Sequence, residues 1–112
     1  MVIDLRGPEE DRGMDEKTTA EALGLAYHSI PVANRDALNW ETAQQVHALL
    51  ENATGTALVH CRSGNRVGAV FALDAAKSQG ASLEEALEIG RAHGMTSLEE
   101  HIRPLLEAGT PP

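Results

Sequence analysis

Short apolar runs alternate along this chain with longer segments in which apolar residues recur at helical spacing. The apolar runs are bounded by Gly, Pro or charged residues and predict three strands. They cover Val2 to Leu5, Leu25 to Ile30 and Thr56 to Val59. The longer segments predict five helices, at 15–23, 39–51, 64–79, 82–93 and 97–106. Alternating strands and helices are typical of a mainly parallel sheet flanked by helices, so we predict an α/β fold.

Capping residues mark several of these helix ends. Asn39 can cap the second helix, because its side chain can accept a hydrogen bond from the first turn. Two capping boxes predict the starts of the last two helices: Ser82 with Glu85, and Ser97 with Glu100. Pro104 lies inside the last helical pattern, and we expect it to kink or shorten that helix.

Length and charge narrow the class of protein. The 112 residues suit one domain, which we predict at 1–108 with a C-terminal tail at 109–112. A formal net charge of −8 argues against nucleic acid or an anionic membrane as a partner. No apolar run has the length of a membrane span, and the start is too charged for a secretion signal. We therefore predict a cytoplasmic protein.

The potential metal ligands are few and scattered. The single cysteine excludes an internal disulfide and a two-cysteine metal motif. His28, His47, His93 and His101 lie far apart without ligand spacing. We predict no metal and no cofactor.

One segment combines a thiol, a tight loop and an arginine after the third predicted strand. It reads His60-Cys61-Arg62-Ser63-Gly64-Asn65-Arg66. N–H groups at the start of a helix, together with the fork of Arg66, can bind an oxyanion. The same positive field lowers the pKa of a thiol, which predicts a thiolate nucleophile at Cys61. Gly64 suits a positive φ in this loop.

Three blocks of the sequence, taken in order, resemble the phosphatase-like domain family of beta-lactamase hydrolase-like proteins, within the cysteine-based protein tyrosine phosphatase superfamily. They are Val2-Ile3-Asp4-Leu5-Arg6, Gly24 to Val32, and the cysteine segment. The resemblance covers roughly residues 1–106 and implies a central parallel sheet with helices on both sides. Members usually carry another strand–helix element before the first block, so we expect a truncated member or a fragment.

The resemblance implies roles in phosphoester hydrolysis through a phosphocysteine. Cys61 would be the nucleophile and Arg66 would bind the phosphoryl oxygens. The N–H groups of Arg62, Ser63, Gly64, Asn65 and Arg66 would cradle those oxygens, and His60 would help to set the pKa of the thiol. Asp36, after the second strand, is the candidate general acid.

Two departures keep other functions open. Tyrosine phosphatases have Cys-x5-Arg with a Ser or Thr after the arginine, whereas here the spacing is Cys-x4-Arg and Val67 follows. Asn34 also falls near the usual position of the acid. A loop of this shorter length equally resembles the active-site loop of single-domain rhodaneses, which carries a cysteine persulfide.

Three hypotheses follow. The first is a cysteine-dependent hydrolase that acts on a phosphorylated protein or a small phosphoester. The second is a rhodanese-like sulfurtransferase with a sulfur donor and acceptor, and the third is an anion-binding regulatory domain without turnover. The sequence does not indicate an oligomeric state.

The remaining polar residues are expected to serve structure. Asp4 and Arg6, at the end of the first strand, could pair with each other's neighbours or line the mouth of the site, and we expect structural use. Trp40 is expected in the core, and the acidic run at 9–11 is expected to be a solvated face.

Overall fold

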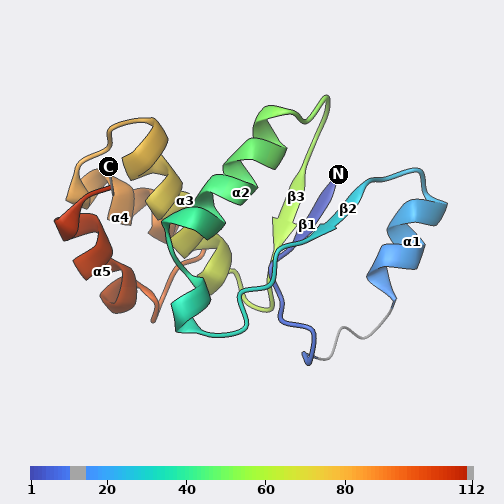
Figure 1. Ribbon diagram of the computed structural model, residues 1–112, viewed down its shortest axis with the longest axis horizontal. Coiled ribbons are helices and arrows are strands. Elements are labelled where there is room, and N and C mark those ends of the chain that lie inside the picture. The colour runs from blue at the N-terminus through green and yellow to red at the C-terminus, as the bar shows by residue number, and fades with distance from the viewer. Residues whose placement is uncertain (11–14, 111–112) are drawn as a thin grey trace.

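A parallel sheet of three short strands organises the fold. The computed structural model of the chain describes residues 1–10 and 15–110. The strands are β1 (Val2–Asp4), β2 (Tyr27–Ser29) and β3 (Leu58–His60), in the order β2-β1-β3. Each neighbour of β1 runs parallel to it (Figure 1). The predicted α/β class with a central parallel sheet is confirmed.

The strand register aligns the carboxyl ends of the strands at one edge. Asp4 of β1 lies opposite Ser29 of β2 and His60 of β3. The ladder extends one residue further, because Leu5 N–H donates to the His60 carbonyl over 2.9 Å. The loops that leave the strands therefore start side by side, which is where ligands bind in open parallel sheets.

Helices lie on both sides of this sheet. They are α1 (Glu16–Ala22), α2 (Trp40–Glu51), α3 (Asn65–Ser78), α4 (Leu83–Ala92) and α5 (Glu99–Ala108), with a 3₁₀ helix η1 (Arg35–Ala37) between β2 and α2. Figure 1 shows α2 and α3 against one face, α1 on the opposite side, and α4 and α5 beyond α3. None of the helices in the described residues is long and apolar enough to cross a membrane.

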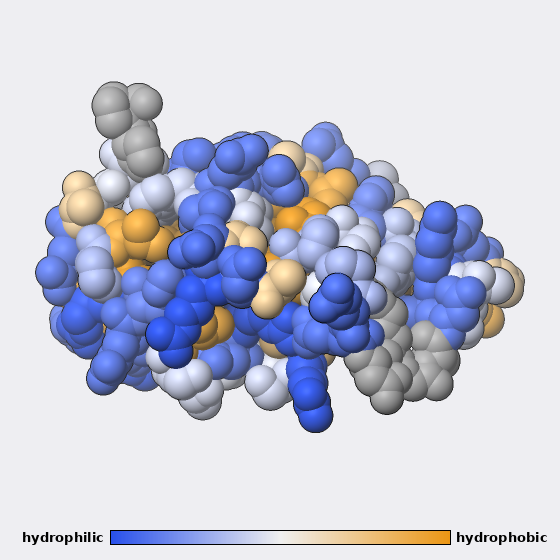
Figure 2. Space-filling view, turned by 60° about the horizontal axis from the view of Figure 1, so that its bottom comes forward, coloured by the Kyte–Doolittle hydropathy of each residue, from blue (hydrophilic) through white to orange (hydrophobic). Residues whose placement is uncertain are grey.

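The hydrophobic core lies between the sheet and the α2–α3 layer. Ile3 and Leu5 extend from β1 into it and are fully buried. They join Val46 of α2 and Leu73 of α3 in one continuous cluster, against which Trp40 is partly buried, as expected. The face shown in Figure 2 is mostly hydrophilic, with hydrophobic residues in separate small patches. The core thus fixes α3, and with it the loop that precedes α3.

Two of the predicted caps are present. The Asn39 side chain accepts a hydrogen bond from Thr42 N–H over 2.9 Å at the start of α2. At the start of α4, Ser82 accepts from Glu85 N–H while Glu85 accepts from Ser82 N–H, which completes the predicted capping box. Local side-chain chemistry therefore sets these two boundaries.

The prediction for the start of the last helix was wrong. α5 begins at Glu99 with Leu98 as its cap residue, and no side chain caps it. The Ser97 hydroxyl instead accepts a hydrogen bond from the Asn65 side-chain amide, over 2.9 Å. A tertiary contact thus replaces the local capping box.

Pro104 does not shorten α5, which was one of the two effects expected of it. The helix continues through it to Ala108. Proline removes one backbone donor at this position. Ile102 and Leu106 are both buried and lie four residues apart on one face of the helix. Their burial in the core holds the helix together on both sides of the exposed proline.

Candidate active site

The cysteine loop connects β3 to α3 at the carboxyl edge of the sheet. Cys61 directly follows β3 and is buried, with 9% of its surface exposed. Gly64 has φ of 92°, a left-handed conformation that glycine adopts at little cost, as the sequence predicted. The chain then enters α3 at Asn65. This geometry turns the N-terminus of α3 toward the thiol.

Backbone N–H groups surround the sulfur of Cys61. Gly64 N–H donates to Sγ over 3.1 Å. Burial alone raises the pKa of Cys61, but hydrogen bonding from the N–H groups of Val67, Ser63, Gly64 and Arg66 outweighs it and holds the pKa below its ordinary value. The loop therefore stabilises a thiolate, and the amide of Val67 takes part although the sequence did not point to it.

Alkylation should report this thiolate directly, because Cys61 is the only cysteine in the chain. We expect the rate of reaction with iodoacetamide to reach half its maximum at a lower pH in the folded protein than in the urea-unfolded protein. A lowered pKa leaves more thiolate at a given pH, and the thiolate is the reacting form. Rates measured between pH 5 and 10 give both midpoints. Coincident midpoints, or a higher midpoint in the folded protein, would contradict the prediction.

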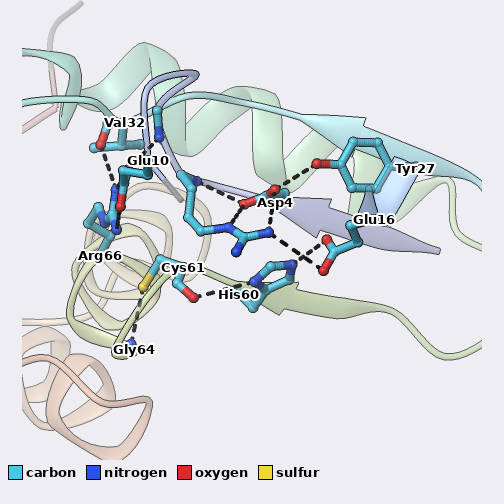
Figure 3. A network of polar contacts seen from close by, with 11 residues as sticks. Asp4, Glu10, Glu16, Tyr27, Val32, His60, Cys61, Gly64 and Arg66 are labelled. Atoms are coloured by element: carbon cyan, nitrogen blue, oxygen red, sulfur yellow. Dashed lines mark hydrogen bonds and ion pairs between the residues drawn. The ribbon is translucent and has the colours of Figure 1, made fainter. Parts of the chain in front are cut away.

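Arg66 is bound by two segments that lie far from it in the sequence. Its Nη1 donates to Glu10 Oε2 over 2.6 Å and to the Val32 carbonyl over 3.1 Å, and its Nη2 donates to Glu10 Oε1 over 2.7 Å (Figure 3). Hydrogen bonding to Glu10 raises the pKa of Arg66, and interaction with the Cys61 sulfur acts in the same direction. Glu10 was expected on a solvated face. That expectation was wrong, because the Glu10 carboxylate forms an ion pair with the Arg66 guanidinium. Asp11 of the same acidic run lies outside the described residues.

Stability should depend on this ion pair in acid. The hydrogen bond from Arg66 lowers the pKa of Glu10 from 4.5 to about 2. A carboxyl whose pKa falls on folding stabilises the folded state above the unfolded value, and this contribution is lost as the pH falls from about 4.5 to about 2. Urea unfolding at a series of pH values should show a loss over this window that is smaller in Glu10→Gln. An unchanged loss in that variant would contradict the assignment.

His60 belongs to a second polar network on the other side of Cys61. Its Nε2 lies 2.6 Å from Glu16 Oε1, and its Nδ1 lies 3.3 Å from the Cys61 carbonyl oxygen. Arg6 binds both Asp4 oxygens, over 2.9 and 3.1 Å, and lies 3.6 Å from Glu16 (Figure 3). The network thus connects His60, the residue before Cys61, to β1 and α1. It also bears out the structural pairing expected of Asp4 and Arg6.

This network holds the buried carboxyl of Asp4 in its negatively charged form. Burial alone raises its pKa, but hydrogen bonds from Arg6 and Tyr27 hold the pKa of this carboxyl well below its usual range. Asp4, Glu16 and His60 each offer one atom that could bind a metal ion, and these atoms lie within 4.8 Å of one another. The sequence did not reveal this grouping. The Arg6 guanidinium already binds both carboxylates, so it supplies the positive charge that a metal ion would bring.

A cleft of about 740 Å³ opens beside Arg66 at the carboxyl ends of the strands. Its lining comes from the connections after β1 and β2, from the first turn of α3 and from the α4–α5 connection: residues 7–10, 32–35, Leu38, Asn65, Arg66, Ser97 and Leu98. Cys61 does not line the cleft. Asp36 is exposed on η1 and lines a separate hollow, which shares Arg35 and Leu38 with the cleft. Asn34 does line the cleft, and its side chain caps η1 by accepting from Ala37 N–H.

The other residues of the loop divide between solvent and structure. The side chains of Arg62 and Ser63 are exposed. The Asn65 side chain accepts from Thr96 N–H over 2.7 Å and from Leu98 N–H over 3.3 Å, while it donates to Ser97. Asn65 therefore fastens the α4–α5 connection to the cysteine loop.

The fold and the site define a class, a parallel α/β domain with a buried cysteine in the loop between β3 and α3, at the carboxyl edge of the sheet. Similar sequences occur in two curated proteins named "Beta-lactamase hydrolase-like protein" from Xylella fastidiosa, strains Temecula1 / ATCC 700964 and 9a5c. Each is 32% identical over 97 residues, which cover 83% of this chain and 22% of the relative. The chain thus spans less than a quarter of their length. No family model matches it, and no solved structure matches it.

Proposed function

We propose that this protein is a cysteine-dependent phosphoester hydrolase. The observation that carries the proposal is the hydrogen bond from Gly64 N–H to the Cys61 sulfur, over 3.1 Å, at the turn into α3. Against the opposing effect of burial, the N–H groups of Val67, Ser63, Gly64 and Arg66 hold the pKa of this thiol below its ordinary value. A thiolate and a cluster of donors are the two requirements for attack on phosphorus and for binding the oxygens that carry its charge. The name of the curated relatives also supports a hydrolase.

The reaction proceeds in two displacements. The Cys61 thiolate attacks phosphorus, so that an S–P bond forms while the P–O bond to the leaving group breaks. The leaving oxygen takes a proton from Asp36 or from water, and Asp36 needs η1 to shift because it now lines the neighbouring hollow. Water then attacks phosphorus and gives its proton to the ionised Asp36 or to bulk water, the S–P bond breaks, and phosphate leaves with the thiolate restored. Arg66 and the loop amides stabilise the phosphoryl oxygens in both steps.

A sulfurtransferase is the second candidate, and the depth of the sulfur favours it. Cys61 is 9% exposed and does not line the cleft, so a single sulfur atom reaches it more readily than a tetrahedral phosphoryl group. In this reaction the thiolate takes the outer sulfur of thiosulfate, forming an S–S bond as sulfite leaves. Cyanide or a thiol then removes that sulfur and restores the thiolate.

A paired assay separates the two reactions. Purified protein is tested for hydrolysis of p-nitrophenyl phosphate and for thiosulfate:cyanide sulfurtransfer, each beside Cys61→Ser. Phosphate release that depends on Cys61 supports the hydrolase, whereas thiocyanate formation without phosphate release supports the sulfurtransferase. Tungstate binding with neither activity supports an anion-binding domain.

A further inference from the structure

Glu10 takes one edge of the Arg66 guanidinium, and no oxygen among the described residues takes the other edge. A guanidinium has five N–H donors, arranged as an end fork between Nη1 and Nη2 and a side fork between Nε and Nη2. The carboxylate of Glu10 takes the end fork, over 2.6 and 2.7 Å, and the Val32 carbonyl takes the second hydrogen of Nη1. The two remaining donors, on Nε and Nη2, therefore belong to the side fork.

The side fork is the edge that can serve the proposed chemistry. Hydrogen bonding to Glu10 raises the pKa of Arg66, and Cys61 acts in the same direction. With the end fork taken by Glu10, the side fork is the edge that can face the sulfur. Glu10 is held in turn, because its Oε2 accepts from Gly7 N–H over 2.5 Å. Arg66 is thus fixed at its outer end by two strand-end loops, and no oxygen among the described residues accepts from its side fork.

We infer that Glu10 is a positioning residue that orients Arg66 so that its Nε–Nη2 edge receives the oxyanion of the substrate. The inference rests on the proposed function and deepens it, because it assigns to Glu10 a part that neither the motif nor the relatives' name indicates. The opposite arrangement is a gate, in which the carboxylate of Glu10 occupies the site of the anion and has to leave first. The two arrangements predict opposite effects of removing the charge.

The test combines tungstate affinity with the mobility of the Arg66 side chain. Glu10→Gln keeps the shape of the side chain but removes its charge and one of its two acceptor oxygens. Positioning predicts that the variant binds tungstate about 10-fold more weakly or worse, because a free side chain must be ordered on binding. The Nε–H signal of Arg66, assigned with Arg66→Lys, should also show faster motion by ¹⁵N relaxation. Glu10→Asp, which keeps the charge and loses reach, should weaken binding as well.

Glu9→Gln is the matched control. Glu9 lies next in the sequence, is exposed, lines the same cleft and forms no ion pair with any residue in the described part of the chain. The Glu9→Gln variant removes the same charge, and we expect it to change the affinity for tungstate by less than Glu10→Gln does. Unchanged or tighter tungstate binding in Glu10→Gln would overturn positioning, and tighter binding would establish the gate.

Failure of the proposed function gives a different result. If the unaltered protein binds no tungstate and releases no phosphate, the hydrolase proposal is lost. The relaxation data then decide the role of Glu10 alone. Faster motion of Arg66 in Glu10→Gln but not in Glu9→Gln supports positioning, and equal motion in both variants overturns it.

Discussion

Replacement of Cys61 by serine is expected to abolish phosphate release, with a loss of about 1,000-fold or more. A serine hydroxyl stays protonated at neutral pH, so the four N–H groups that stabilise the thiolate have no anion to act on. The same groups can donate to the serine oxygen, and we therefore expect the fold to be kept. Rates with p-nitrophenyl phosphate, beside thermal unfolding and near-ultraviolet circular dichroism, measure both effects.

Alkylation of the unaltered protein gives an independent control for this variant. Because the chain has a single cysteine, iodoacetamide modifies the same sulfur without any change of sequence. Both treatments should remove activity to the same extent. Substantial phosphate release by folded Cys61→Ser would mean that the nucleophile lies elsewhere.

Replacement of Gly68 by alanine is expected to destabilise the protein by about 3 kcal/mol or more. Gly68 lies in α3, and a Cβ atom there would overlap the backbone nitrogen of Met95 and the carbonyl oxygen of Gly90. Neither backbone atom can turn aside as a side chain can, so α4 has to move away from α3. Because the connection after α4 is bound to Asn65, this movement should also reach the cysteine loop. Urea unfolding measures the loss.

Gly55→Ala is the matched control for Gly68→Ala. A Cβ atom at Gly55 meets no atom within 4 Å, and its φ does not fall in the left-handed region. We expect the free energy of unfolding to change by less than about 1 kcal/mol. If Gly68→Ala is as stable as Gly55→Ala, the close approach of α3 and α4 in this structure is not present in solution.

The order of strands and helices could be predicted because each element is specified locally. Apolar runs marked all three strands, although each ordered strand has only three residues. The caps at Asn39 and Ser82 lie within four residues of the groups that they bind. The parallel sheet followed from the alternation of elements, and it brought Cys61 to the edge where the sequence predicted a ligand site.

The long-range side-chain contacts of the site could not be predicted in the same way. Glu10 and Arg66 lie 56 residues apart, and nothing local distinguishes Glu10 from exposed Glu9. The contact of Asn65 with Ser97 spans 32 residues and removed the capping box that the local pattern favoured. Long-range pairing of charged and polar side chains depends on the assembled loops. The roles of Cys61, Arg66 and Asp36 stay predictions until activity is measured.

The most direct test of the account is the mass of the protein quenched with acid during turnover of p-nitrophenyl phosphate. The account predicts that a fraction of the protein carries the added mass of one phosphoryl group, located on the peptide that contains Cys61 and absent from Cys61→Ser. Phosphate release without that adduct in any quenched sample, or an adduct on another residue, would contradict the central claim.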